Sequence, residues 1–175
     1  MVSAAVFGAI ADAETPPGIA AEIPLPALER KGASVFLEGI QDAGNVGAII
    51  RSAAAFGVAS VTLDRQCAEA WSPKVLRAGM GGHFAVGIRQ VDDLLAAIGG
   101  ARLICSVVHG GEPLRQANLA GAWAFGAEGA GLSPQVLARA AARVTIPMAG
   151  GESLNVAAAA AICLYESFSR PGGGS

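Results

Sequence analysis

Two glycine-rich turns near the C-terminus constrain most strongly what this chain can fold into. The first, Gly126–Gly131, follows the apolar run Ala122–Phe125, and the second, Met148–Asn155, follows the apolar run Val144–Ile146. Each turn leads into a helix-forming run. Loops at the carboxyl ends of adjacent strands are where open α/β sheets bind ligands. We therefore expect the two turns to follow neighbouring strands and to form one binding site.

The same alternation of strand-forming and helix-forming segments occupies most of the chain. The expected strands are Ser34–Leu37, Ser60–Leu63, Leu103–Val108, Ala122–Phe125 and Val144–Ile146. The expected helices are about Gly47–Phe56, one that opens at Ser72-Pro73, one from Asp92 or Asp93 to about Ile98, one that opens at Ser133-Pro134, and about Leu154–Ser169. Alternating strands and helices predict an α/β fold with a parallel sheet flanked by helices.

The chain divides into three expected parts. Residues 1–33 are rich in proline turns and are expected to form an extended lead-in or linker, with one short strand near Val2–Ile10. Residues 34–170 contain the alternating segments and form the main domain. Residues 171–175, which begin with proline and continue as Gly-Gly-Gly-Ser, are expected to be a flexible tail.

The apolar content is high, with 53% hydrophobic residues and a mean hydropathy of +0.49. The apolar stretch Leu154–Tyr165 is interrupted by Asn155 and is much shorter than the roughly 20 residues that a membrane-spanning helix needs. The N-terminal residues have no basic segment ahead of them, as a secretory signal would. We expect no membrane segment, and the richness in Ala, Val and Gly indicates a parallel sheet buried on both faces.

The cysteines and histidines are too few and too scattered for common metal or nucleophile sites. Cys67, Cys105 and Cys163 form no CxxC pair and are odd in number, which predicts reduced core thiols in a cytoplasmic protein. His83 and His109 are the only histidines. We expect no metal site and no histidine-based triad, and the sequence contains no GxSxG elbow.

Charge is distributed unevenly along this chain of net charge −2. Residues 1–50 contain six acidic and two basic residues, whereas residues 51–90 contain two acidic and five basic residues. The acidic total argues weakly against a strong standalone nucleic-acid binder. The basic middle segment is either a surface that faces a polyanion or a scattered solvated face, and charge alone leaves both interpretations open.

The glycine turns do not match the common nucleotide-binding motifs. Gly126, Gly129 and Gly131 have the spacing GxxGxG, whereas the dinucleotide fingerprint is GxGxxG, and the chain contains no GxxxxGK[ST] phosphate loop. A Rossmann dehydrogenase and a P-loop enzyme are therefore disfavoured. Taken singly, either glycine turn is equally well explained as a tight turn.

Polar residues beside the turns are more informative as a set. Glu128 lies within a glycine-flanked loop, where a carboxylate has little packing reason to be. Asn45 and Arg51 bracket the start of the first helix, and Ser153 and Asn155 stand at the start of the last one. Taken alone, Asn45 is a typical turn residue, Arg51 a surface charge and Ser153 a helix N-cap.

Three segments follow one another in a fixed order along the chain. They are LEGIQDAGNVGAIIRSAAAFGV (Leu37–Val58), FGAEGAGLS (Phe125–Ser133) and IPMAGGESLNVAAAAAICLYE (Ile146–Glu166). In this order and at these intervals they closely resemble the three signatures of the SpoU/TrmH family of SPOUT RNA ribose methyltransferases. Any one segment alone would be weak evidence for the family, but the resemblance of all three together is very specific.

The resemblance implies a fold, a cofactor and a reaction. Members of the family have a parallel α/β fold whose C-terminal segment threads through a loop as a deep trefoil knot, an exception to the rule that connections do not thread. They bind S-adenosylmethionine within the knot, act as homodimers, and methylate a ribose 2′-hydroxyl of tRNA or rRNA. The resemblance implies the same cofactor, an RNA substrate and a homodimer for this chain.

The matched motifs also imply the site residues. The cofactor-binding residues that they indicate are Gly126, Ile146, Met148, Leu154 and Asn155, and the catalytic and substrate-positioning residues are Asn45, Arg51, Glu128, Ser153 and Asn155. In the family proposal the arginine promotes deprotonation of the 2′-hydroxyl. A guanidinium is almost never deprotonated in a protein, so binding a phosphate and stabilising an alkoxide is the easier role for Arg51. Glu128 and Asn45 are expected to brace the loops.

The chain departs from the family pattern in three places. Gly79 stands where many relatives carry serine, so we assign no catalytic residue to that loop. The run Gly150–Ser153 is one residue shorter than the usual form. No RNA-recognition domain precedes the lead-in, although Ile10–Ile19 resembles the join after such a domain in rRNA-type relatives, which favours rRNA over tRNA as substrate. The chain is either a catalytic-domain fragment or a minimal natural enzyme.

The leading hypothesis is an S-adenosylmethionine-dependent RNA 2′-O-methyltransferase. The alternative from another class is a catalytically inactive RNA-binding or dimerisation module of the same fold. An unrelated small-molecule α/β enzyme is a remote third option. The presence of the whole polar set favours the enzyme, because a binding module has no need of it.

Overall fold

A seven-stranded parallel sheet organises the chain in this computed structural model, which describes residues 2–10, 18–19, 23–26 and 29–170. The strand order is β3-β2-β1-β6-β4-β7-β5. The strands are β1 (Ser34–Glu38), β2 (Ser60–Asp64), β3 (Gly87–Val91), β4 (Leu103–Ser106), β5 (Glu112–Pro113), β6 (Ala122–Gly126) and β7 (Ala140–Thr145). The helices are α1 (Ala4–Ile10), α2 (Ala43–Ala55), α3 (Pro73–Gly79), α4 (Leu94–Ile98), α5 (Pro134–Ala138) and α6 (Val156–Ser169), with a 3-10 turn η1 (Gly82–Phe84).

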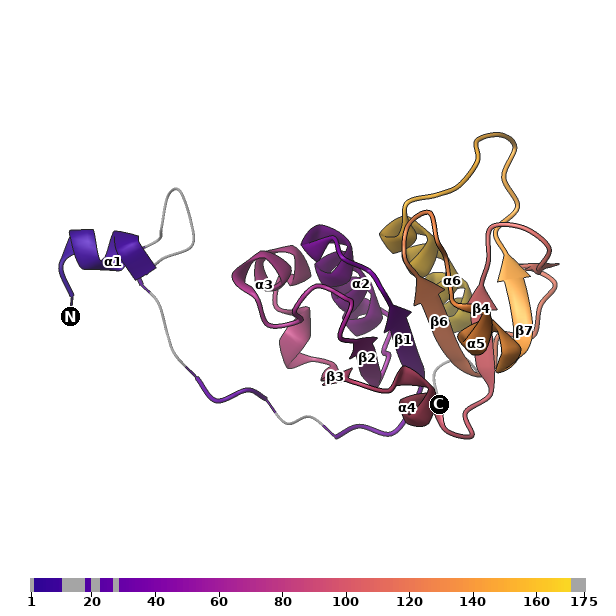
Figure 1. Ribbon diagram of the computed structural model, residues 1–175, viewed down its shortest axis with the longest axis horizontal. Coiled ribbons are helices and arrows are strands. Elements are labelled where there is room, and N and C mark those ends of the chain that lie inside the picture. Colours follow the sequence, from indigo (N-terminus) through magenta and orange to yellow (C-terminus); the bar gives the residue numbers. More distant parts are fainter. Residues whose placement is uncertain (1, 11–17, 20–22, 27–28, 171–175) are drawn as a thin grey trace.

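Side chains that alternate along the central strands divide the core into two layers. Val35 and Leu37 of β1, with Trp123 and Phe125 of β6, face the side covered by α2, α3 and α6. Phe36 of β1 faces the opposite side, which is covered by α4 and α5. Helices therefore cover both faces of the sheet (Figure 1), as the Ala-rich and Val-rich composition predicts for parallel strands. The α/β fold with a parallel sheet is confirmed.

Helix α2 begins four residues earlier than the sequence predicts. The Asp42 carboxylate accepts a hydrogen bond from the Asn45 backbone N–H at 2.7 Å and so caps the helix. Residues 43–46, which precede the expected start of the helix at Gly47, therefore form the first turn of α2. As expected, Ile49 and Ala53 are buried and Arg51 is exposed. Gly57, with φ +70, follows the helix end.

The prediction of a short strand near Val2–Ile10 is wrong, because the structure has helix α1 over Ala4–Ile10. Ser3 begins this helix: its hydroxyl accepts from the Val6 N–H at 3.3 Å and its carbonyl from the Phe7 N–H at 2.8 Å. Alanine is a strong helix former, and Val2, Val6 and Ile10 stand four residues apart, which is the spacing of a helix and not of a strand. The flexible tail expected at 171–175 lies outside the described residues.

Two strands escape the sequence analysis, and one is longer than expected. Strand β3 pairs with β2 at the edge of the sheet, and Gly-Ile-Arg-Gln-Val has no clear alternation. Strand β5 has two residues and pairs in parallel with β7. Strand β7 starts at Ala140, in a stretch of three alanines whose local propensity favours a helix. Pairing with a neighbouring strand, rather than local propensity, decides these three cases.

The cysteines are buried and free, as the sequence predicts. Burial raises the pKa of the Cys67 and Cys163 thiols to about 12 and that of Cys105 to about 11. A side-chain hydrogen bond with Asp64 adds to the shift at Cys67. These thiols are core residues rather than nucleophiles. Within the described residues, no helix is long and apolar enough to span a membrane.

Candidate active site

A cavity of about 780 Å³ opens at the carboxyl edge of β4, β6 and β7. It is lined by the loop after β4, the glycine turn after β6, the loop after β7, which extends above the sheet in Figure 1, and the start of α6. The expectation that the two turns follow neighbouring strands is wrong, because β4 lies between β6 and β7. The order of strands in the sheet differs from their order in the chain, so a third loop enters the site.

The turn after β6 is closed by its own backbone. The Gly131 N–H donates to the Ala127 carbonyl at 2.8 Å, and Gly129 and Gly131 have φ values of +85 and +70. A Cβ at Gly126 would lie 2.2 Å from the backbone of Gly131. The glycines are therefore required by this turn, because the chain doubles back on itself without room for a side chain. The turn presents its backbone to the cavity.

The far end of the turn is attached to β1. The Glu38 carboxylate accepts a hydrogen bond from the Ser133 N–H at 2.7 Å, and Ser133 then caps α5 through Val136. A carboxylate bound to a backbone N–H is a charge-assisted and therefore strong contact. The glycine turn is thus held at both ends by the central strands.

Three of the predicted polar residues form a hydrogen-bonded triangle beside the cavity. Asn45 Nδ2 and Asn155 Nδ2 each donate to Glu128 Oε1 at 2.9 Å, and Asn155 Nδ2 also donates to Asn45 Oδ1 at 2.9 Å. The three residues come from α2, the glycine turn and the start of α6. The triangle therefore joins the three sequence signatures at one point, and it occupies Glu128 and Asn45 with bracing contacts.

Asn155 also begins helix α6. Its Oδ1 accepts from the Ala157 N–H at 2.9 Å and from the Ala158 N–H at 3.2 Å. The N-cap is therefore Asn155, and Ser153 lies before it with an exposed side chain at the cavity. One asparagine amide thus uses its oxygen for the helix and its nitrogen for the triangle.

Replacing Asn155 by alanine is expected to lower the free energy of unfolding by about 1–2 kcal/mol, because the α6 cap is lost. Asn155→Ser keeps a capping oxygen but removes the two bridges, and is expected to recover most of that stability. Urea denaturation of the three proteins measures the difference. An Asn155→Ser protein as unstable as Asn155→Ala would assign the stabilisation to the bridges instead of the cap.

All five predicted cofactor-binding residues line the cavity: Gly126, Ile146, Met148, Leu154 and Asn155. Of the predicted catalytic residues, Glu128, Ser153 and Asn155 line it, and Asn45 is joined to it through the triangle. Arg51 is different. It is exposed in the middle of α2 and is not part of the cavity lining. The structure thus assembles four of the five predicted catalytic residues and leaves Arg51 apart.

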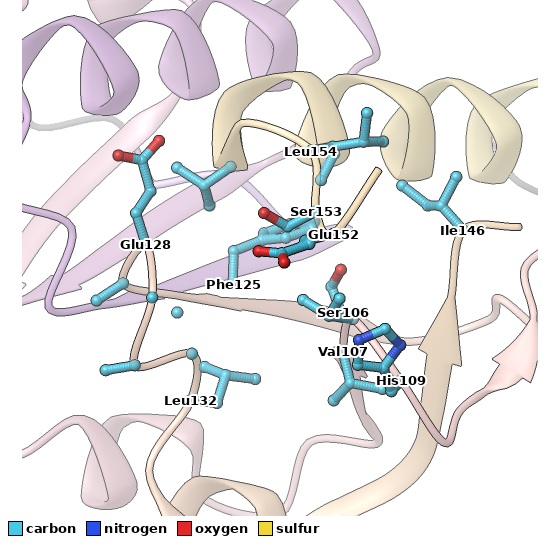
Figure 2. A pocket seen from close by; sticks show the side chains of 18 of the residues that line it. Ser106, Val107, His109, Phe125, Glu128, Leu132, Ile146, Glu152, Ser153 and Leu154 are labelled. Carbon is cyan, nitrogen blue, oxygen red and sulfur yellow. The ribbon is translucent and has the colours of Figure 1, made fainter. Parts of the chain in front are cut away.

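The end of β4 and the loop after it supply cavity residues that the sequence motifs do not indicate. Ser106 and His109 line the cavity on the side facing Glu152 and Ser153 (Figure 2). The available signal is His109-Gly110-Gly111 directly after a strong strand, because parallel strands end at the same edge of a sheet. Recognising it requires knowing that β4 lies between β6 and β7.

The lining combines apolar walls with a polar rim. Phe125, Leu132 and Ile146 supply apolar surface, while Glu128 and Glu152 supply carboxylates (Figure 2). A cavity of this size, largely apolar with a few placed polar groups, is typical of a small-molecule or cofactor site. The Arg143 guanidinium also belongs to the lining, so the cavity has charged side chains of both signs. No cluster of metal-ligating side chains occurs in the described ranges.

Comparisons with known proteins agree on one family. The model of the SpoU rRNA Methylase family matches residues 32–165. The 23S rRNA (guanosine(2553)-2′-O)-methyltransferase RlmP of Bacillus subtilis is 34% identical over 178 residues, covering 94% of this chain and 70% of that protein. A putative RNA methyltransferase of the TrmH family from Porphyromonas gingivalis superposes with a TM-score of 0.77 at 34% identity, over 91% of this chain and 69% of that one.

A structure with bound cofactor is also similar. The AdoMet-bound rRNA methyltransferase from Sinorhizobium meliloti has a TM-score of 0.71 at 29% identity, over 81% of this chain and 57% of that one. The chain spans 57–70% of the length of these three proteins. The family match covers the three signatures and the whole cavity-forming region. The chain therefore belongs to the SpoU rRNA methylase family.

Proposed function

We propose that this chain transfers the methyl group of S-adenosylmethionine to a ribose 2′-hydroxyl of RNA. The observation that carries the proposal is the convergence of the three signatures on one cavity, where Asn45, Glu128 and Asn155 share hydrogen bonds. Relatives named as 23S rRNA 2′-O-methyltransferases favour rRNA over tRNA as the substrate.

The cavity fits S-adenosylmethionine in size and in chemistry. Its volume is within the usual range for nucleotide-sized ligands. The glycine turn offers backbone groups for the adenine, with Ile146 and Leu154 as apolar walls. Glu128 and Glu152 at the rim complement a sulfonium cation. When bound, the cofactor supplies an electrophilic methyl group, and the protein contributes mainly by positioning donor and acceptor.

The acceptor side requires a group that stabilises negative charge developing on the ribose oxygen. We assign this role to Arg51, which binds an RNA phosphate and stabilises the alkoxide as a fixed cation. Ser153, exposed at the cavity, is placed to contact the incoming ribose. Asn45 and Glu128 hold the glycine turn and the start of α6 together through the triangle and do not themselves exchange protons.

A homodimer is part of the proposal, and it accounts for the position of Arg51. Ile162, Tyr165 and Phe168 expose apolar surface along α6, and Phe56 of α2 packs against the rings of Tyr165 and Phe168 at 5.8 and 6.1 Å. Two copies that pack through this face bring α2 of one toward the cavity of the other. Arg51 then serves the site of the partner.

A trefoil knot at the C-terminal end is the second structural part of the proposal. The segment between β4 and β6 is bonded to the end of β7, where the Leu114 N–H donates to the Thr145 carbonyl at 2.9 Å. The Arg170 guanidinium, just after α6, donates to the carbonyls of Leu114 at 2.9 Å and Ala117 at 2.6 Å. These contacts of one loop with both β7 and the end of α6 support threading of the last segment through that loop.

The three buried free thiols support a cytoplasmic location.

Calorimetry with S-adenosylmethionine tests the proposal, followed by transfer of labelled methyl groups to rRNA and tRNA with ribose analysis by mass spectrometry. We expect saturable cofactor binding and 2′-O-methylated nucleotides, in rRNA above tRNA. An absence of binding at near-millimolar cofactor would refute the enzyme. Binding of RNA without cofactor binding would favour the inactive module of the same fold.

A further inference from the structure

An exposed apolar surface on α3 and η1 lies outside the cavity and has no role in the proposal above. It consists of Leu76, Met80 and Phe84, and we call it the α3–η1 surface. Met80 is 71% exposed and Phe84 56% exposed, although side chains of these types are usually buried. Neither residue lines the cavity.

The chain segment that carries the α3–η1 surface has a positive net charge. From residue 70 to residue 91 the chain contains Lys74, Arg77 and Arg89 and no acidic residue. Lys74 and Arg77 lie on α3 itself, and both are exposed. An apolar surface on a segment whose own charged residues are all positive is complementary to a polyanion with flat bases.

The turn that carries Met80 and Phe84 is rigidly built. The His83 ring between them is buried, and its Nε2–H donates to the Ala70 carbonyl at 2.8 Å. The ring also packs on Trp71, with ring centres 5.1 Å apart. A Cβ at Gly79 would lie 2.5 Å from that ring, so glycine is required beside it. His83 thus anchors the turn and leaves its two neighbours exposed.

Met80 itself has a left-handed backbone, with φ +46. It is the one non-glycine residue with positive φ in the described part of the chain. Such a conformation costs about 1 kcal/mol or more and is found preferentially at functional sites. Here it turns the chain at the end of α3, where the side chain remains exposed. The Met80 N–H donates to the carbonyls of Leu76 and Arg77 and so closes the last turn of α3.

The α3–η1 surface adjoins the residue that the proposed reaction assigns to RNA. A Cβ on Gly82, in the same turn, would lie 3.1 Å from the Arg51 Cα and 3.2 Å from the Ile50 carbonyl oxygen. The turn therefore packs directly on α2 at Arg51. A nucleotide whose phosphate is bound by Arg51 has its neighbouring base within reach of this turn.

We propose that the α3–η1 surface binds an unpaired nucleotide of the RNA substrate, with the base stacked on Phe84 and flanked by Met80. This inference rests on the proposed function and names a second contact of the same substrate. Stacking on an aromatic ring is sequence-tolerant and is worth about 1–3 kcal/mol per base. Lys74 and Arg77 add the attraction for phosphate, which weakens as salt concentration rises.

The test uses the full chain, a short fluorescein-labelled single-stranded RNA of mixed sequence, and the same strand annealed into a duplex. Fluorescence anisotropy measures affinity. Phe84→Ala and Phe84→Leu are expected to weaken single-strand binding by about tenfold, because leucine keeps the apolar bulk and loses the ring. Phe84→Tyr keeps the ring and is expected to bind like the unchanged protein. Duplex binding is expected to change less than twofold, because paired bases are not available for stacking.

Two further measurements separate this inference from its alternatives. Calorimetry with S-adenosylmethionine and light scattering are repeated on every variant, and both are expected to stay unchanged. RNA affinity equal in Phe84→Ala and the unchanged protein overturns the inference, while cofactor binding and methyl transfer by the unchanged protein leave the proposed function standing. A change in the oligomeric mass of the Phe84→Ala protein, measured by light scattering, overturns the inference too. It identifies the α3–η1 surface as an interface between copies of this chain.

Discussion

Replacing Arg51 by alanine is expected to reduce the turnover number for RNA methylation by at least about 100-fold, the effect typical of losing a group that stabilises a developing oxyanion. S-adenosylmethionine affinity is expected to remain unchanged, because Arg51 is outside the cavity lining. Steady-state methylation at saturating RNA and cofactor measures the first quantity, and calorimetry measures the second. The two readouts together separate a role at the acceptor from a role at the cofactor.

Two variants serve as controls for Arg51. Arg51→Lys keeps the charge but loses the planar fork of the guanidinium, so it is expected to recover only part of the rate. Arg115→Ala removes an exposed cation between β5 and β6, outside the cavity lining and the α3–η1 surface, and is expected to leave the turnover number unchanged. A large loss of cofactor affinity in Arg51→Ala would contradict the division of roles between Arg51 and the cavity.

Gly126→Ala is expected to have the largest effect on the fold and the site together. The added methyl group would lie 2.2–2.3 Å from backbone atoms of Gly131 and Leu132. Those atoms belong to the closed turn and cannot move like a flexible side chain. Over-packing of this kind costs roughly 1–3 kcal/mol and more where backbone must shift. We expect a loss of about 3 kcal/mol in the free energy of unfolding and no measurable S-adenosylmethionine binding.

Gly150→Ala is the matched control in the other glycine-rich turn. A Cβ there meets nothing within 4 Å, and Gly150 does not have positive φ. Its free energy of unfolding is expected to change by less than about 0.5 kcal/mol. Denaturant unfolding and calorimetry compare the two variants. Equal stability of both proteins would show that the turn after β6 can open without cost, which contradicts the packing described above.

The sequence predicts those parts of the fold in which local pattern and tertiary pairing agree. Strands β1, β2, β4 and β6 are apolar and rich in β-branched or aromatic residues, and they are found where expected. Caps predict helices equally well, as with Asp93 before α4 and Ser133 before α5. Elements whose local preference is weak or contrary, such as β3 and the first half of β7, are absent from the prediction. Helix α1 is predicted wrongly as a strand, although its alanines favour a helix.

The candidate site is predicted well in its residues and poorly in its arrangement. Motif resemblance indicates Gly126, Ile146, Met148 and Leu154, and each lines the cavity. It does not indicate the loop after β4, since that loop carries no signature. The bracing role expected for Glu128 rests on its contacts with Asn45, which is 83 positions away along the chain, and with Asn155, which is 27 positions away. No periodicity in the sequence encodes contacts over such separations.

The sequence by itself determined the family, the alternating parallel architecture and most of the residues around the cavity, because short motifs and hydrophobic patterns are local properties of a chain. Only the tertiary structure decided which strands are neighbours, that β4 brings a third loop between the two glycine turns, and that Arg51 lies apart from the cavity. The physical reason is that sheet order follows from long-range pairing and burial, and these depend on the whole chain at once.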